Sequence, residues 1–146
     1  MSFVNKLIYA SIGTAAFFLL SHPTTYEILN TFLPTKIKVD PCPSPNTRII
    51  QVIIFAILMF SILVLLNMFA IHNKKSIWYF AKQALFATLI FYILSSTEMH
   101  TLMADITKRK DSLLKDGCPT ISAKFFHSIL YFIAAFGSMY IPCKCD

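Results

Sequence analysis

The sequence contains few charged side chains and few glycines. Charged residues make up 14% of the 146 residues and hydrophobic residues 56%, against roughly 25% and 45–50% in typical soluble domains. This composition excludes an ordinary soluble domain. The three glycines, Gly13, Gly117 and Gly137, form neither a phosphate-binding loop nor a potassium-channel filter. The net charge of +6 is spread along the chain, whereas nucleic-acid binding needs a basic groove.

Side chains for catalytic or metal chemistry are also sparse. The histidines are scattered at positions 22, 72, 100 and 127, and no Cys-x-x-Cys pair is present. Zinc sites and thioredoxin-like sites need closely spaced ligands or thiols. We therefore expect no enzyme activity, no metal, no cofactor and no small-molecule substrate. A membrane thiol oxidoreductase is the enzyme alternative.

Four apolar runs are long enough to cross a bilayer. They cover Phe3 to Leu20, Ile49 to Ile71, Ile77 to Leu94 and Ile121 to Ile141. A helix needs roughly 20 residues to span the hydrocarbon core, and ~17 can suffice. The first run also resembles a secretory signal, but no small-residue cleavage site follows it, so we expect a retained helix. The sequence predicts four transmembrane helices.

Two of these runs carry a lysine near their start, Lys82 and Lys124. Lysines near a helix end can extend their ammonium group to the membrane surface, so we interpret both as interfacial anchors. An ion or proton pathway is the alternative, because charge inside a membrane is often functional. No acidic residue lies in any of the four runs to pair with these lysines.

The sequence contains an internal repeat, in which each copy predicts one helical hairpin. Ala10 and Ala84, Thr14 and Thr88, and Phe17 and Phe91 match at a spacing of 74 residues, while Cys42 and Cys118, Arg48 and Lys124, and Gln51 and His127 match at 76. We expect a single membrane domain over residues 1–146, with one repeat over 3–71 and another over 77–141. Both long linkers then lie on one side, so the two hairpins are inserted in parallel around an axis along the membrane normal.

Each long linker has a helical pattern and a capping signal. Thr24 to Leu33 and Glu98 to Ile106 place apolar residues at spacings of three and four, as in short helices on a membrane surface. Ser44 and Thr120 follow a Cys-Pro pair and can cap the next span. The predicted fold is all-α: a four-transmembrane-helix bundle built from two parallel-repeat hairpins with short interfacial helices in the linkers.

Small residues and cysteines suggest how the helices are held together. Ala10 and Thr14 lie four residues apart, as do Ala84 and Thr88, and such small faces let helices approach closely. Cys42 and Cys118 occupy equivalent linker positions, where they form either a disulfide between the hairpins or two buried thiols. Cys143 and Cys145 lie on the other side and are too close together for an easy bridge.

The linkers share a motif, carried by Leu20-Ser21-His22-Pro23, Tyr26 and Cys42-Pro43-Ser44, and less completely by Leu94-Ser95 and Cys118-Pro119-Thr120. This motif resembles small membrane proteins of nucleocytoplasmic large DNA viruses. The resemblance implies an internal virion membrane beneath the capsid, with lipid and capsid or other virion membrane proteins as partners. It also implies viral thiol oxidation, which permits disulfides.

The resemblance also implies a function for the chain. We expect a structural membrane protein that docks the virion membrane to the capsid shell as a minor capsid or anchoring component. The alternative from another class is a small channel or transporter, similar to a viroporin. A conducting protein needs polar side chains along a path through the membrane, and the centres of the four runs are rich in Phe, Ile, Leu and Ala.

Overall fold

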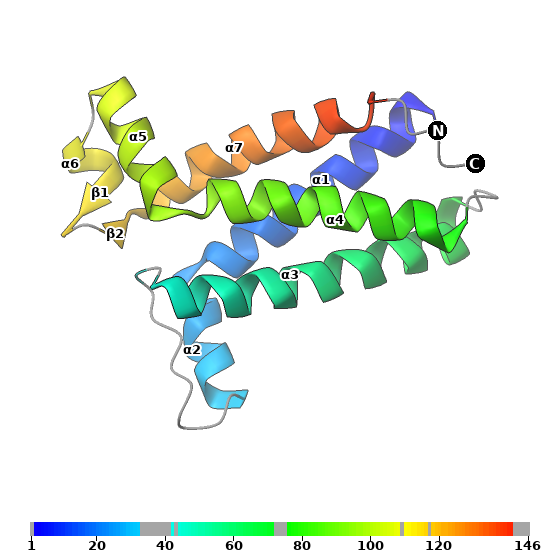
Figure 1. Ribbon diagram of the computed structural model, residues 1–146, viewed down its shortest axis with the longest axis horizontal. Coiled ribbons are helices and arrows are strands. Elements are labelled where there is room, and N and C mark those ends of the chain that lie inside the picture. Colours follow the sequence, from blue (N-terminus) through cyan, green and yellow to red (C-terminus); the bar gives the residue numbers. More distant parts are fainter. Residues whose placement is uncertain are drawn as a thin grey trace.

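Four long helices lie side by side in the structure (Figure 1). This computed structural model describes residues 2–32, 42, 44–71, 76–108, 110–116 and 118–141. The long helices are α1 (Phe3–Ser21), α3 (Pro45–Leu66), α4 (Ile77–Leu94) and α7 (Ile121–Ser138). A π-helical turn, η1 (Asn67–Ile71), continues α3. All four helices are long and apolar enough to cross a membrane, which supports an integral membrane protein.

Serine and threonine side chains set where most helices begin. Ser2, Ser44, Ser76, Ser96 and Thr120 each accept a hydrogen bond from a backbone N–H two or three residues further on. Such caps satisfy donors that the first helical turn leaves unpaired. The caps at Ser44 and Thr120 are those that the sequence predicts. Because Ser44 is the cap, α3 begins one turn before the apolar run that predicts it.

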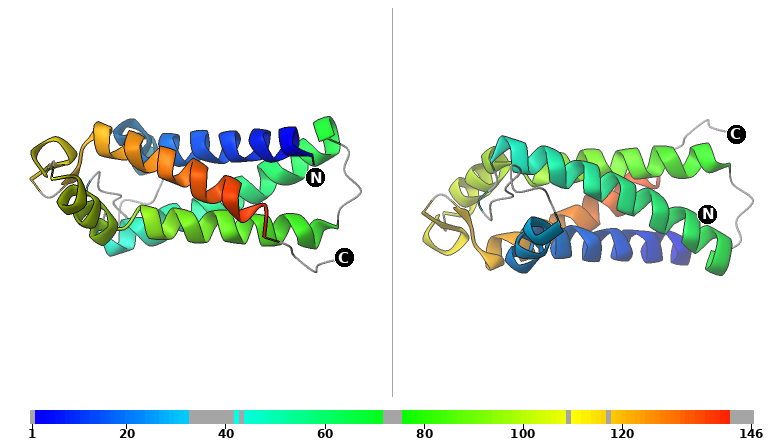
Figure 2. Two further views of the ribbon diagram at one scale, coloured as in Figure 1. Left: turned by 90° about the horizontal axis from the view of Figure 1, so that it is seen from above. Right: turned by 90° about the horizontal axis from the view of Figure 1, so that it is seen from below.

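The four spans alternate in direction along the bundle. α1 and α4 run one way and α3 and α7 the other, so that α1 begins where α7 ends (Figures 1 and 2). Two ring contacts join these helix ends. The Phe3 and Phe136 rings are 5.6 Å apart, and the Lys6 Nζ lies 3.5 Å from the centre of the Tyr140 ring.

The opposite end of the bundle, here named the linker end, carries the short elements. α2 (Pro23–Phe32) and α5 (Thr97–Thr107) leave the bundle on different sides (Figure 1). α6 (Lys110–Leu113) and two short strands follow α5. The two linker helices are present at the predicted places, with bounds shifted by a residue; Leu33, at the predicted end of the first, lies outside the described residues.

A small sheet departs from the all-helical prediction. β1 (Leu114–Lys115) pairs antiparallel with β2 (Cys118–Pro119). Asp116, which follows β1, has a left-handed backbone with φ of 52°, a conformation common in tight turns for Asp and Asn. The chain therefore reverses here just before α7, a local effect that hydrophobic periodicity does not reveal.

The interior of the bundle is built around four aromatic rings, one from each span. Phe17, Phe55, Phe91 and Tyr131 are all at most 1% exposed. Phe55 stacks on Phe91 with ring centres 4.3 Å apart, and Phe17 stacks on Tyr131 at 5.0 Å. Edge contacts of 5.3 Å between Phe17 and Phe91, and of 5.9 Å between Phe55 and Tyr131, close the cycle. We name these four residues the aromatic quartet.

Replacement of one quartet ring should destabilise the bundle strongly. We expect Phe91→Ala to lower the free energy of unfolding by about 3–5 kcal/mol, because two ring contacts are lost and a cavity remains. Phe86→Ala on the same helix is the matched control, since Phe86 is 43% exposed. Denaturation of the purified protein in mixed micelles measures both losses, and equal losses would show that the quartet has no special role in packing.

Candidate functional site: two polar clusters at the linker end

Most buried polar side chains gather at the linker end of the spans. Among the described residues, those at most 9% exposed that lie in the part of the bundle nearest this end are Ser21, Thr47, Gln51, Ser95, His100, Lys124, His127 and Ser128. Buried polar groups must find partners, and the requirement is strict in lipid. Ser95 and Ser128 donate to carbonyls of their own helical segments. The longer side chains gather in two clusters, one around Gln51 and one around His127.

Gln51 of α3 forms the first cluster with the end of α1 and with α2. Its Nε2 donates a hydrogen bond of 3.2 Å to the Leu20 carbonyl, which lies in the last turn of α1 and lacks a helical partner of its own. The Gln51 side chain also lies within hydrogen-bonding reach of Tyr26. Burial raises the pKa of the Tyr26 phenol, and this hydrogen bond opposes the rise. The first cluster thus seals the junction of α1 and α2.

His127 of α7 forms the second cluster with the end of α4 and with α5. Its ring lies within hydrogen-bonding reach of the Leu94 backbone. The ring centres of His127 and His100 are 4.0 Å apart, and the two residues are 1% and 6% exposed. The Nδ1 atoms of both rings are buried without a hydrogen-bond partner. Burial first, and then the nearby His127 and Lys124, lower the pKa of His100 to about 3.

Sequence reasoning missed this histidine pair. The histidines were interpreted as scattered, but His100 and His127 are in contact. The pair corresponds to residues of the first cluster, because His127 matches Gln51 at a spacing of 76 residues, and His100 matches Tyr26 at 74. Two polar residues that contact each other in one half are therefore matched by two histidines in the other.

Basic side chains reach across both clusters. Lys124 is only 5% exposed, and its Nζ lies 5.4 Å from the centre of the Tyr26 ring. The interpretation of Lys124 as an anchor that extends to the membrane surface therefore does not fit, because Tyr26 of α2 folds over it. Lys82 is exposed, as an anchor requires. Arg48 pairs with Glu98 at 3.3 Å and lies 5.0 Å from the Tyr92 ring.

A disulfide lies beside the clusters. The structure joins Cys42 and Cys118, whose Cα atoms are 5.2 Å apart, a separation that the bond geometry allows. Thr120, two residues after Cys118, caps α7 and also donates to the Ser112 carbonyl. The disulfide therefore links the segment before α3 to β2, the short strand that precedes α7. Cys143 and Cys145 lie outside the described residues.

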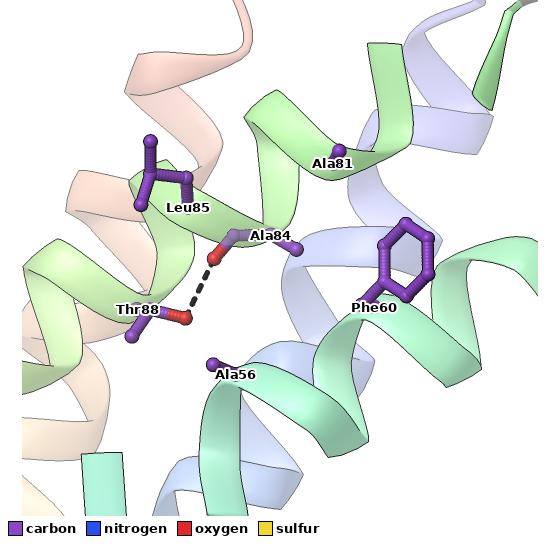
Figure 3. A pocket seen from close by; sticks show the side chains of 6 residues that line it. All are labelled: Ala56, Phe60, Ala81, Ala84, Leu85 and Thr88. Carbon is purple, nitrogen blue, oxygen red and sulfur yellow. Dashed lines mark hydrogen bonds between the residues drawn. The ribbon is translucent and has the colours of Figure 1, made fainter. Parts of the chain in front are cut away.

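The predicted packing residues lie beside two apolar grooves on the outer face. One groove of about 360 Å³ runs between α3 and α4 and is lined by Ala56, Phe60, Ala81, Ala84, Leu85 and Thr88 (Figure 3). The other, of about 380 Å³, runs between α1 and α7 and is lined by Ser11, Thr14, Ala15, Phe18, Phe125, Ser128 and Phe132. Ala10 is fully buried. Thr14 and Thr88 donate to the carbonyls of Ala10 and Ala84, so these hydroxyl groups are satisfied within their own helices.

Metal ligands are not grouped in the part of the chain that the structure describes. No three His, Cys, Asp or Glu residues lie together there in a way that could hold a metal ion. Comparison of the chain with protein-family models, with curated proteins and with solved structures found no match.

Loss of the Gln51 side-chain hydrogen bonds should destabilise the junction of α1, α2 and α3. We expect Gln51→Leu to cost about 1–3 kcal/mol of unfolding free energy, because the Leu20 carbonyl and Tyr26 remain buried without their partner. Glu98→Gln is the control, since the Glu98 side chain is 78% exposed and an ion pair of so exposed a carboxylate contributes little. Mixed-micelle denaturation compares them, and a Gln51→Leu loss no greater than the control contradicts the sealing role.

The disulfide gives a direct chemical prediction. Alkylation of the unfolded chain without reductant should leave Cys42 and Cys118 unlabelled, and prior reduction should label both, because a disulfide has no reactive thiol. Peptide mapping by mass spectrometry reads the result. Cys118→Ser is the control, since it should expose Cys42 to the reagent without reduction. Labelling of both wild-type cysteines without reductant would show that the protein carries free thiols.

Proposed function

We propose that this chain is a structural integral membrane protein that holds a membrane to a protein shell beside it. The setting, taken from the resemblance described above, is the internal membrane of a virion beneath its capsid, where the chain acts as a minor capsid or anchoring component. Its partners are lipid and the capsid or other virion membrane proteins. The support comes from how the interior and the linker end of the bundle are built.

The filled interior is the observation that carries this proposal. The aromatic quartet brings one ring from each span to the middle of the bundle, and all four side chains are at most 1% exposed. A conducting path through the bundle would have to pass these rings. A cavity beside Tyr131 and Met59 has a volume of only about 20 Å³, which is about the volume that one water needs. The geometry favours a packing element over a channel or transporter.

The proposal includes a fold of two parallel repeats, and matched contacts support it. Phe55 stacks on Phe91, and their equivalents Tyr131 and Phe17 also stack. Gln51 contacts the end of α1, and its equivalent His127 contacts the end of α4. The two helix pairs with the most extensive contact are α3 with α4 and α7 with α1. If α1 corresponds to α4 and α3 to α7, each of these pairs is the counterpart of the other. A rotation of about 180° relates such parallel repeats.

The linker helices provide the docking surface in this proposal. Each exposes two apolar side chains at matched positions: Ile28 and Phe32 on α2, and Leu102 and Ile106 on α5, all between 51% and 83% exposed. Short helices with such faces lie in the membrane interface. Because α2 and α5 leave the bundle on different sides (Figure 1), they extend the protein along the membrane surface. From there they meet headgroups below and shell proteins above.

Reconstitution in liposomes distinguishes the structural role from the channel alternative. We expect the purified protein to leave ion and dye flux at the level of empty liposomes, because the quartet fills the interior. Flux is measured with entrapped fluorescent indicators. Lys82→Ala and Asn67→Ala are the matched variants, since a channel would depend on polar side chains within its spans. Selective flux that either variant abolishes would overturn the structural role.

A test of docking complements the flux measurement. Removal of the gene should yield particles whose membrane separates from the shell, visible by electron cryotomography, while substitution of all four exposed linker residues by serine should reproduce the defect with the bundle intact. Particles that assemble normally in both cases would contradict the anchoring role.

A further inference from the structure

The two clusters at the linker end are built alike but carry different chemistry. In the first, Tyr26 and Gln51 lie within hydrogen-bonding reach of each other. In the second, His100 and His127 are in ring contact at 4.0 Å, and both Nδ1 atoms lack a partner. Tyrosine and glutamine do not change charge between pH 5 and pH 8, whereas histidine does. Only the second cluster can therefore respond to mild acid.

Charged groups around the pair offer no compensation for an added proton. On α7, Lys124 is buried one turn from His127, and it acts electrostatically on His100. On α3, Arg48 is held by Glu98, the carboxylate that α5 itself supplies at this end. The other described titratable side chains of the surrounding elements are Tyr26 and Glu27 on α2, Tyr79, Lys82 and Tyr92 on α4, Asp105 on α5, Lys115 on β1 and Tyr131 on α7, with Lys108 and Asp116 directly after α5 and β1. Among all these, the groups that bear on the charge of His100 are His127 and Lys124.

A metal ion is a poorer explanation of the pair. Two histidines supply two ligands, and a zinc site needs three or four. No third His, Cys, Asp or Glu joins them among the described residues. The neighbouring Lys124 ammonium also repels a cation. The Nδ1 atoms instead have no hydrogen-bond partner that would stabilise a proton on either ring, so the buried contact favours neutral imidazoles.

We propose that the His100–His127 contact is a proton-sensitive latch, which holds α5 against α7 near neutral pH and releases it in mildly acidic surroundings. Protonation of either ring places a buried positive charge beside Lys124 and the other imidazole. Release of α5 brings both rings to water, where the charge is solvated. α2 has no such latch, so the device acts on one linker helix and leaves the other in place. The proposed latch depends on the four-helix membrane bundle and does not depend on the proposed location in a virion.

The direction of the pH effect follows from the two states of His100. In the closed state its pKa is lowered to about 3, with burial as the main cause, and in the released state it returns to about 6.5. The open state therefore binds more protons as the pH falls below about 6.5, so the closed state loses stability. At a pH about 1.5 units below the released pKa, one proton favours opening by about 30-fold.

Hydrogen exchange of the full chain in lipid nanodiscs tests the latch. Backbone protection factors, corrected for the pH dependence of intrinsic exchange, are compared at neutral pH and at the mildly acidic pH. We expect protection of α5 to fall about 30-fold when one imidazole takes up a proton, while that of α2 stays constant as the internal control. The double variant His100→Tyr with His127→Gln carries the residues of the other cluster and should abolish the fall.

Three outcomes would overturn the latch: constant protection of α5, an equal fall in α2, or an undiminished fall in the double variant. The double variant is compared with the wild type only if the two proteins have equal protection of α2 at neutral pH, because equal protection shows that the fold is intact. If it does not, the comparison of α5 with α2 in the wild-type chain decides alone.

Discussion

The contact among Phe17, Phe55, Phe91 and Tyr131 is the interaction on which the rest of the bundle depends. In a bilayer, lipid tails are as apolar as the helices, so close packing rather than exclusion of water holds spans together. Each ring of the quartet touches two others, and the cycle includes all four spans. The stacked pairs join α1 to α7 and α3 to α4, the helices in most extensive contact. Each span therefore packs mainly on a span of the other half, and neither half has a complete interior alone.

The unpaired backbone carbonyls at the ends of α1 and α4 are a second constraint on the structure. A helix leaves its last carbonyls unpaired, and a membrane interior offers no water to satisfy them. Gln51 and His127 lie on the neighbouring spans. The Gln51 amide donates a hydrogen bond to the Leu20 carbonyl, and the His127 ring lies within hydrogen-bonding reach of the Leu94 backbone. The linker helices then cover these junctions with Tyr26 and His100. The polar residues in this region thus stabilise the ends of the helices. Their chemical identity also determines whether a cluster can take up a proton.

Local patterns predicted much of this structure, and long-range contacts account for the remainder. Four apolar runs, two helical linker patterns and the caps at Ser44 and Thr120 depend on neighbouring residues, so the sequence reveals them directly. The burial of Lys124 depends on where α2 folds, and no local pattern contains that information. The histidine contact joins residues 27 positions apart in the chain. The matched residues Tyr26 and Gln51 are also in contact, but that contact is long-range as well, so the sequence alone does not reveal either one.

The difference between the clusters also extends to their basic residues. Arg48 of the first half reaches across to Glu98 of α5 and forms an ion pair, whereas Lys124 at the matched position lies over the uncharged ring of Tyr26. A ring face attracts a cation but does not neutralise it. Positive charge is thus balanced at the Arg48 position and unbalanced at the Lys124 position, beside the two histidines. Since the low dielectric of a buried site strengthens repulsion between like charges, the half that carries the imidazoles is also the half least able to accept a proton while closed.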